Sequence, residues 1–341
     1  MTELNNTDRE VRSRMAFRTH PTGESPPPDS LSPTEQRLDA SMALDELPTV
    51  EVLRLLNEHD RIAVDAVSEV LEDLAALVDV AVDRFRRGGR IHYFGAGTSG
   101  RLAVLDAAEL IPTFNLPEGR VVAHIAGGPD AFLRAVEDAE DSQDSGALAA
   151  SVVGADDVAI GLAASGNTPY VRGALMAARD HGAHTALVSC NPRAAIAAVA
   201  EQHIFLDTGP EVLTGSTRLK AATAEKLALS GFSTALLVAA GRTWSNLMVS
   251  LVATNEKLRR RTRRILRQAT GISETAAANL LAEADGELKP ALVSHLARVS
   301  ISAARAHLDA CEGSVREAMA RAAENTPPTT PSAHPTTPSD R

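Results

Sequence analysis

Short apolar runs alternate with alanine-rich helical stretches through the middle of the chain. The runs occupy residues 91–94, 121–125, 158–162, 186–188 and 203–206. Strands that alternate with helices along a chain pair in parallel through right-handed crossovers, and the helices then cover both faces of the sheet. The pattern therefore predicts an α/β fold, a three-layer α/β/α sandwich around a five-stranded parallel sheet.

Helical periodicity flanks this region on both sides. Apolar residues recur at helical spacing from 41 to 88, where a glycine pair ends the segment. The pattern is again helical throughout 211–268, and residues 269–324 form a small unit of short helices. We therefore expect a sheet domain with its N-terminal helices at 34–268, followed by a small helical domain at 269–324.

Two proline-rich polar segments, 1–33 and 325–341, lie outside these domains. Their composition offers too little apolar surface for a core, so we expect both to be disordered and assign them no chemistry. No apolar run approaches the ~20 residues that cross a bilayer. The polar N-terminus also lacks the apolar region of a secretory signal. These features predict a cytoplasmic protein without membrane association.

Charge and cysteine content exclude several classes of protein. The chain of 341 residues has a formal net charge of −10, which argues against a nucleic-acid or anionic-membrane binder. The cationic run 257–267 is then expected to be a solvated helix face. The two cysteines, Cys190 and Cys311, are too few for a disulfide framework or a cysteine zinc site. Cys190 is expected to be a buried spacer rather than a nucleophile.

A glycine-rich turn follows the first predicted strand. It reads Gly95-Ala96-Gly97-Thr98-Ser99-Gly100 and comes directly before a helix. Glycines let the backbone approach a ligand closely, and the amides at a helix N-terminus favour an anion. The glycines match the dinucleotide fingerprint, but the next strand lacks the acidic residue that would hold a ribose. The hydroxyls of Thr98 and Ser99 suit a phosphate instead.

Two further turns repeat this arrangement. Their polar residues are Ser165, Gly166, Asn167 and Thr168 after the third strand, and Ser216, Thr217 and Lys220 before an alanine-rich helix. One such turn is typical of an ordinary helix start. Three in one domain favour a phosphorylated ligand beyond the carboxyl ends of the strands. A nucleotide triphosphatase is disfavoured because no lysine follows a glycine in the Walker form.

One carboxylate lies where the helical pattern calls for an apolar residue. Leu102, Leu105 and Glu109 are spaced i, i+3 and i+7, so they share one face of the helix after the first turn. Pro112 predicts that this helix ends soon afterwards. A half-buried carboxylate near the C-terminal end of a helix should have a raised pKa, which suits a general acid. A structural glutamate bonded to an arginine or an amide explains the pattern equally well.

A second glutamate continues an apolar row in the same way. Phe132, Val136 and Glu140 are spaced i, i+4 and i+8 in a predicted helix after the second strand. Four further acidic residues surround it: Glu137, Asp138, Asp141 and Asp144. We expect these to face solvent, and their spacing gives no reason to propose a magnesium site. No histidine forms a metal-ligand spacing with another histidine or cysteine, so the sequence predicts no metal.

Several long stretches together resemble the N-acetylmuramic acid 6-phosphate etherase family of sugar isomerase (SIS) domain proteins. They are GAGTSGRLAVLDAAE, IAGG with AVEDAEDS, GLAASGNTPYV, VSCNP, and EVLTGSTRLKAATAEKLALS with NLMV and ATNEKL. The resemblance runs from Thr34-Glu35 to about Ala323 and leaves out only the two tails. It implies the SIS fold, a small C-terminal helical domain, and a homodimer with sites near the subunit interface.

The resemblance also implies a reaction on cell-wall amino sugar, for recycling or catabolism. The family cleaves the ether between the lactyl group and C3 of N-acetylmuramic acid 6-phosphate, giving N-acetylglucosamine 6-phosphate and D-lactate. Its route is elimination followed by hydration, without metal or other cofactor. Ring opening places an aldehyde at C1, which acidifies the proton on C2. A base removes that proton, an acid assists the departure of lactate from C3, and water then adds.

The family's motifs assign roles to residues at matching positions. Glu109 in DAAE resembles the proton donor to the departing lactate, and Glu140 in VEDAEDS resembles the second catalytic carboxylate, the candidate base at C2. The phosphosugar-binding loops of SIS domains are matched by Thr98, Ser99, Gly100, Ser165, Gly166, Asn167 and Thr168. Further candidates, which would reach a site at a dimer interface, are Ser216, Thr217 and Lys220.

The proline-rich tails are extra to the family pattern, and the sequence also departs from it in two short segments. DAAEL stands where a DASE-like segment followed by prolines is expected, and Gln36-Arg37-Leu38 stands where an asparagine is expected. Neither departure removes a catalytic candidate, so both bear on fine specificity rather than on the type of reaction.

Three other functions are compatible with parts of the pattern. A phosphosugar-sensing regulator, like the glucokinase regulatory protein, needs only the loops. A DNA-binding regulator would need a basic helix-turn-helix, and residues 41–88 are not basic. A sugar-phosphate isomerase would use a similar base and phosphate anchor. The presence of both Glu109 and Glu140 favours the etherase over a sensor.

Overall fold

Five parallel strands form the sheet, as predicted. The computed structural model describes residues 31–250 and 256–324. The strands are β1 (Ile91–Gly95), β2 (Val121–Ile125), β3 (Val158–Leu162), β4 (His184–Ser189) and β5 (Gln202–Phe205). They lie in the order β2-β1-β3-β4-β5, with every neighbouring pair parallel. The order reverses between β1 and β3, and open α/β sheets bind ligands beyond the carboxyl ends of the strands at such a point.

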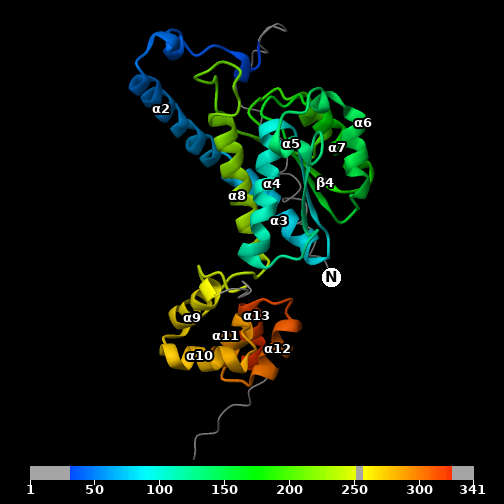
Figure 1. Cartoon of the computed structure of the whole chain (residues 1–341). Coiled ribbons are helices and arrows are strands. Elements are labelled where there is room, and N and C mark those ends of the chain that lie inside the picture. Colours follow the sequence, from blue (N-terminus) through cyan, green and yellow to red (C-terminus); the bar gives the residue numbers. More distant parts are fainter. Residues whose placement is uncertain (1–30, 251–255, 325–341) are drawn as a thin grey trace, which may run out of the picture. The chain divides into compact units, whose positions relative to one another are not determined.

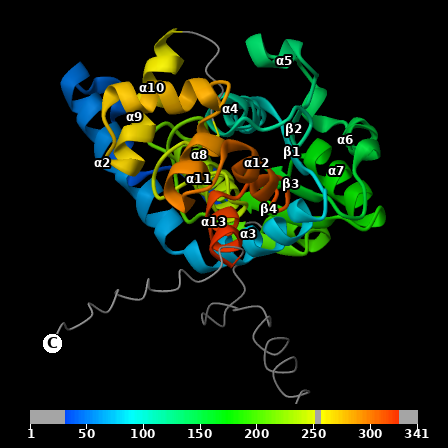
Figure 2. The same cartoon turned by 90° about the horizontal axis from the view of Figure 1, so that it is seen from below.

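Helices cover both faces of this sheet (Figures 1 and 2). One face carries α2 (Thr49–Ser68), α3 (Leu71–Arg86), α4 (Gly97–Phe114) and α8 (Lys220–Ala239). The other carries α6 (Gln143–Ala149) and α7 (Pro169–Asp180). Side chains alternate along each strand, so Tyr93 enters the first core and its neighbour Phe94 enters the second. This is the predicted three-layer architecture.

Short elements complete the first part of the chain. They are η1 (Pro33–Glu35), η2 (Asp39–Ser41), η3 (Leu44–Glu46), α5 (Asp130–Leu133), η4 (Ala139–Asp141), η5 (Ala150–Val152) and η6 (Ala195–Val199). The segment 41–88 is helical as expected, apart from 3-10 turns at its start and a break between α2 and α3. The expectation of helix throughout 211–268 is wrong. Gly215 and Gly241 adopt positive φ at the two ends of α8, and the backbone around each is irregular.

The C-terminal helices enclose a core of their own. They are α9 (Glu256–Thr270), α10 (Glu274–Glu283), α11 (Leu288–Ala297), α12 (Ile301–Asp309) and α13 (Val315–Glu324). Ile265 and Leu266 of α9 are buried in this core, so α9 packs with the small helical unit, and the boundary expected at 268 falls inside this helix. The two proline-rich tails lie outside the described residues, apart from 31–33.

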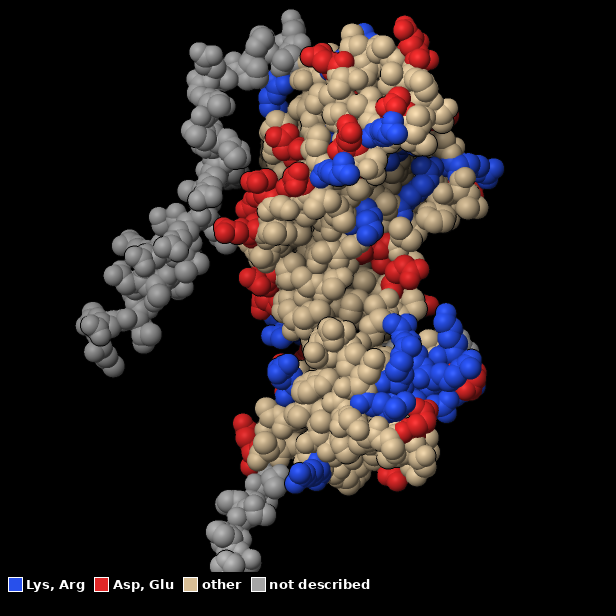
Figure 3. All heavy atoms as spheres, turned by 90° about the vertical axis from the view of Figure 1, so that its left-hand side faces the viewer, with Lys and Arg blue, Asp and Glu red and all other residues tan. Residues whose placement is uncertain are grey.

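Basic side chains gather on α9, on the surface that Figure 3 shows. Arg263 and Arg267 form ion pairs with Glu274, and Arg259 pairs with Glu256. Most of the charged residues of this helix are exposed, as expected for a solvated face. In the described ranges, no helix combines the length and the apolar character needed to cross a bilayer.

Two histidines are packed inside the sheet domain on neighbouring strands. His92 of β1 is fully buried, and its Nδ1 lies 3.0 Å from Nε2 of His124 on β2. His92 Nε2 lies 3.3 Å from a carboxylate oxygen of Asp157. The rings of His124 and Phe94 stack with centroids 4.6 Å apart. Burial lowers the pKa of both histidines, that of His124 to about 4.

We expect this pair to make the fold sensitive to acid. Because the folded pKa of His124 lies below its unfolded value, the unfolded state binds protons more readily between about pH 4 and pH 6.5, and the free energy of unfolding falls as pH drops through that window. One such group contributes at most about 1.4 kcal/mol per pH unit. Urea unfolding from pH 4.5 to 6.5 should show a shallower slope for His124→Gln than for wild type. The exposed His181 provides the control through His181→Gln, and equal slopes for all three proteins would contradict the prediction.

Candidate active site

The turn after β1 leaves three backbone amides free at the start of α4. Ala96 is the N-cap and makes no side-chain cap bond, and the first helix bond runs from the Gly100 amide to the Ala96 carbonyl at 3.1 Å. The amides of Gly97, Thr98 and Ser99 therefore have no acceptor within the helix and lie at its positive end. A Cβ on Gly100 would collide with the preceding strand, so glycine permits this close packing. The geometry suits an anion.

The turn after β3 is held in place by the segment that follows β4. Gly166 has φ +70°, and a Cβ at this position would lie 2.2 Å from Ala194 Cβ. Asn167 Oδ1 accepts a hydrogen bond from the Ala195 amide at 3.2 Å. Only glycine combines this backbone conformation with so close a contact. The turn is therefore tightly shaped before any ligand binds.

The α7 helix starts from this turn and is also without a side-chain cap. Thr168 is the N-cap, and its carbonyl accepts the first helix bond, from Arg172 at 3.1 Å. Ser165 is half-buried, and its carbonyl accepts from the Asn191 side chain at 2.8 Å. Because β1 and β3 are neighbours, the uncapped starts of α4 and α7 flank the point where the strand order reverses. Two of the three predicted phosphate turns thus occupy the expected ligand crevice.

The third turn differs because the start of α8 is already capped. The two carboxylate oxygens of the buried Glu211 accept from the amides of Lys220 and Ala221, at 3.3 and 2.9 Å. Lys220 is buried as well, and its Nζ donates to the Pro210 carbonyl. Burial raises the pKa of Glu211 and lowers the pKa of Lys220. The Lys220 ammonium therefore stabilises the loop before α8 in this structure instead of facing an open site.

The N-terminal segment packs against this third turn. The Gly215 amide donates to the Thr34 carbonyl at 3.2 Å, and Thr34 is fully buried. Ser216 and Thr217 follow and are half-buried. The structure therefore places these two candidates beside the N-terminal segment, and their part in ligand binding stays a prediction.

A buried carboxylate that the motifs did not single out joins the first turn to α8. Glu225 is 1% exposed, and its Oε2 accepts a hydrogen bond from Ser99 Oγ at 2.7 Å. Its Oε1 has no hydrogen-bond partner among the described residues. Burial raises the pKa of Glu225 to about 7, and the bond from Ser99 opposes part of that rise. A sequence signal existed, because Glu225 follows Ala221 and precedes Ala228 in the buried row of its helix.

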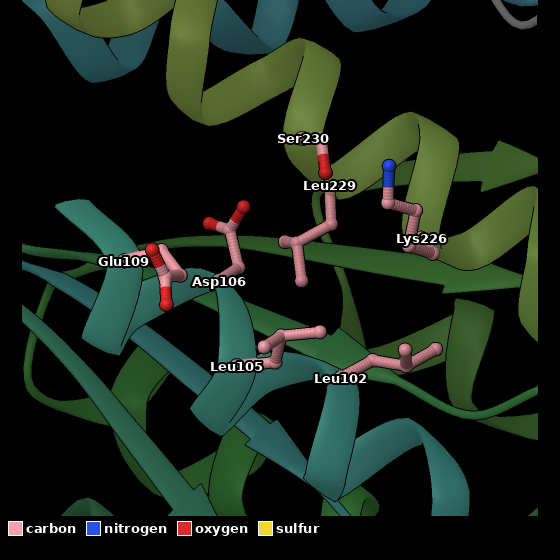
Figure 4. A pocket seen from close by; sticks show the side chains of 7 residues that line it. All are labelled: Leu102, Leu105, Asp106, Glu109, Lys226, Leu229 and Ser230. Atoms are coloured by element: carbon pink, nitrogen blue, oxygen red, sulfur yellow. The ribbon is translucent and has the colours of Figure 1, made fainter. Parts of the chain in front are cut away.

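Glu109 lies on the exposed side of α4, where it lines a pocket between α4 and α8 (Figure 4). The pocket has a volume of about 200 Å³, and its other lining residues are Leu102, Leu105, Asp106, Lys226, Leu229 and Ser230. We expected Glu109 to be half-buried, and this expectation is wrong for a single chain, in which the residue is exposed. The helix passes Pro112 and ends at Phe114, so Glu109 sits more than one turn from the end.

Asp106 is the half-buried acid of this pocket, and sequence reasoning missed it. Its carboxylate accepts from Ser233 Oγ at 3.0 Å and from the Tyr93 hydroxyl at 3.2 Å. Burial raises its pKa to about 6, against the effect of these two hydrogen bonds. Its two partners come from β1 and α8, which no local spacing could reveal. Neither Ser99 nor Ser165 lines either of the two pockets described beside Glu109.

Glu140 does not continue a helical apolar row, so that expectation is wrong. The helix that precedes it, α5, ends at Leu133, and Asp138 has φ +59°. Glu140 is exposed in η4, a single 3-10 turn. The acidic neighbours are exposed, as expected. Among the residues described, no three His, Cys, Asp or Glu side chains come together in an arrangement that could hold a metal ion.

The chain is similar to a known family model, to curated relatives and to solved structures. The family model of the glucokinase regulatory protein N-terminal SIS domain matches residues 73–179. The N-acetylmuramic acid 6-phosphate etherase of Thermobifida fusca is 55% identical over 262 residues, which cover 77% of this chain and 86% of the relative. That of Pectobacterium atrosepticum is 48% identical over 288 residues, which cover 84% of this chain and 95% of the relative. Among solved structures, a phosphoheptose isomerase from Francisella tularensis is 16% identical with a TM-score of 0.46, covering 56% of this chain and 98% of that one.

A third relative, the N-acetylmuramic acid 6-phosphate etherase of Cutibacterium acnes, is 49% identical over 292 residues, which cover 85% of this chain and 96% of the relative. Each of these three matches spans 86% or more of the relative's length. The chain belongs to the N-acetylmuramic acid 6-phosphate etherase family of enzymes, and its central fold is the SIS domain.

Proposed function

We propose that this protein cleaves the lactyl ether of N-acetylmuramic acid 6-phosphate by elimination and hydration, releasing D-lactate and N-acetylglucosamine 6-phosphate. The observation that carries the proposal is the identity of 48–55% to etherases over most of the chain. We place the reaction in the cytoplasm, because a phosphorylated sugar is strongly charged and does not cross a bilayer unaided.

The phosphate of the substrate is proposed to bind at the uncapped starts of α4 and α7. The free amides of Thr98 and Ser99, together with the Thr98 hydroxyl, offer donors on one side of the crevice. Ser165 and Thr168 offer hydroxyls on the other side, with Gly100, Gly166 and Asn167 shaping the two turns. An anion between two helix N-termini gains from both dipoles. The rest of the sugar would extend away from this anchor.

The chemistry needs an acid and a base at C3 and C2 of the open-chain sugar. Glu109 is proposed to protonate the departing lactate and Glu140 to remove the C2 proton. Each such group contributes roughly 10²–10⁴-fold to the rate when it is well placed. Both carboxylates are exposed in one chain, so a partner or the substrate must cover them to supply the water-poor environment that strengthens acid–base catalysis.

Distances along α4 support a site built from two chains. Thr98 and Glu109 are eleven positions apart, which corresponds to a rise of about 16 Å along the helix. A hexose phosphate is shorter than this, so the phosphate end and the acid of one chain are too far apart to share a substrate. We therefore propose a homodimer in which Glu109 of one chain serves the phosphate site of the other.

The exposed face of α4 suits such a pairing. Thr98, Leu102, Leu105 and Glu109 are spaced by four, three and four positions and share one face. Leu105 is 49% exposed although it is apolar. Two copies of α4 that cross antiparallel would set Leu102 against the partner's Leu105 and Glu109 against the partner's Thr98. Exposed apolar side chains of this kind mark interaction surfaces.

A second function, phosphosugar sensing without catalysis, is favoured only by the match to the glucokinase regulatory protein model. A sensor would bind the sugar phosphate and release nothing. The two functions therefore differ in one measurable product.

Our first functional prediction is that the purified protein releases D-lactate from N-acetylmuramic acid 6-phosphate in the presence of a metal chelator. Lactate is measured with a coupled D-lactate dehydrogenase after the chelator has been removed. Binding of the substrate without any lactate would support the sensor and reject the etherase.

The second functional prediction separates the two glutamates. Glu109→Ala should lose lactate release by at least ~10²-fold but still exchange the C2 proton of the substrate with deuterated water, since the proposed base remains. Glu140→Gln should lose both reactions. Proton exchange is followed by NMR, with circular dichroism as the control for folding. The opposite pattern, exchange lost in Glu109→Ala and kept in Glu140→Gln, would show that the assigned roles are wrong.

The third functional prediction concerns the two-chain site. One chain carries Glu109→Ala and the other carries Thr98→Val with Ser99→Ala, and each is inactive alone. A mixed dimer restores one complete site, so a statistical mixture should regain about one quarter of wild-type activity. Activity is compared before and after subunit exchange. A mixture that forms mixed dimers and stays inactive would show that each chain builds its own site.

A further inference from the structure

Glu225 lies deep inside the sheet domain, directly behind the start of α4. It is 1% exposed, and the only hydrogen bond made by its carboxylate among the described residues comes from Ser99 Oγ, at 2.7 Å. The other oxygen, Oε1, has no partner there. A buried carboxylate with one unsatisfied oxygen is costly when it is charged, and such groups need a role that explains them.

Ser99 connects this carboxylate to the proposed phosphate anchor. It is the third residue of α4, and its own amide is one of the three without an acceptor within the helix. Its hydroxyl has a single proton to donate. When Glu225 is ionised, that proton points at Glu225, and Ser99 turns its lone pairs toward any anion at the helix start. An ionised Glu225 therefore opposes phosphate binding through both its charge and the orientation of Ser99.

Few other charges act on Glu225. The Cys190 thiol after β4 is its ionisable neighbour, and its pKa is raised by burial first and then by the charge of Glu225. Lys220 is one turn earlier on α8, where Pro210 and Glu211 hold it. Among the described residues, α2 and α3 contribute no charge that acts on Glu225: Asp60 and His59 of α2 act on Lys220. Asp207 acts on Cys190. No cation therefore holds Glu225 in its charged form.

We propose that Glu225 is a positioning residue for substrate binding: in its protonated form it donates to Ser99 Oγ and thereby turns the Ser99 hydroxyl toward the phosphate. Binding then takes up one proton, which stays on Glu225, and no covalent bond changes. This inference rests on the proposed function only in placing a sugar phosphate at the start of α4.

The proposal has a consequence for affinity at alkaline pH. Since burial sets the pKa of Glu225 near 7, the free protein is largely ionised there above pH 8 and must be protonated when ligand binds. Affinity should then fall by up to about tenfold for each pH unit above pH 8. The ligand itself does not cause this fall, because a phosphate monoester loses its second proton near pH ~6.

The experiment is calorimetric titration with N-acetylglucosamine 6-phosphate between pH 7.5 and pH 9. Wild type should lose affinity as pH rises and should take up close to one proton per ligand at pH 8.5, measured from the heat in buffers of different ionisation enthalpy. Glu225→Gln keeps the shape, donates from its amide to Ser99 and carries no charge. It should bind with an affinity independent of pH and take up no proton.

Ser99→Ala is the matched variant, because it removes the link and leaves Glu225 in place. It should bind more weakly and lose most of the pH slope, and adding Glu225→Gln to it should change affinity far less than the same substitution does in wild type. If Glu225 had only a structural role, its substitution would lower the stability of the protein and leave the pH dependence of affinity unchanged. The proposal is wrong if affinity depends on pH equally in wild type and Glu225→Gln, or if the affinity of wild type does not depend on pH.

The outcome is separable from that of the lactate assay. If the protein releases lactate but Glu225→Gln leaves the pH dependence of affinity unchanged, this inference alone is wrong. If Glu225→Gln abolishes the pH dependence of affinity but the protein releases no lactate, the etherase proposal alone is wrong. If Glu225→Gln does not fold, the loss or persistence of the slope in Ser99→Ala decides the question.

Discussion

The contact between α4 and α8 is the constraint on which the arrangement of the site depends. Ser99 meets Glu225 near the start of both helices, and Asp106 meets Ser233 about two turns later. The two helices therefore run side by side in the same direction, joined at two levels by the buried Glu225 and the half-buried Asp106. This places the free amides of α4 at the carboxyl edge of the sheet and Glu109 in the second half of the helix. In the function that we propose, phosphate binding and acid–base chemistry are then separated within one chain, and the proposed dimer brings them together.

Much of the fold follows from the sequence because it is encoded locally. Apolar runs of four or five residues between alanine-rich helices are sufficient to predict five parallel strands, and all five are present. The turns at Gly97 and Gly166 were predictable for the same reason, since both glycines have positive φ and Gly166 also lies too close to Ala194 for any other residue. The sequence motifs of these two turns could be matched to those of the family residue by residue.

The environments of the carboxylates could not be obtained in this way. Helical periodicity placed Glu109 and Glu140 on apolar rows, but Glu109 lies at the edge of its row and Glu140 is in a separate 3-10 turn after a break at Asp138. Glu225 is buried and Asp106 is half-buried, and each accepts a hydrogen bond from a serine far away in sequence, 126 positions for Glu225 and 127 for Asp106. Periodicity shows which face of a helix a residue occupies, whereas burial depends on what the rest of the chain places there.

The contact between Thr34 and Gly215 affects where the chain can be shortened. The carbonyl of Thr34 satisfies the Gly215 amide, and its side chain is completely enclosed. The segment around Thr34 therefore covers the loop that leads into α8. A shortened version of the protein that begins after Gln36 would lack this segment and would expose the loop to water. The N-terminal limit for truncation or fusion therefore lies before Ser32, well ahead of the first long helix.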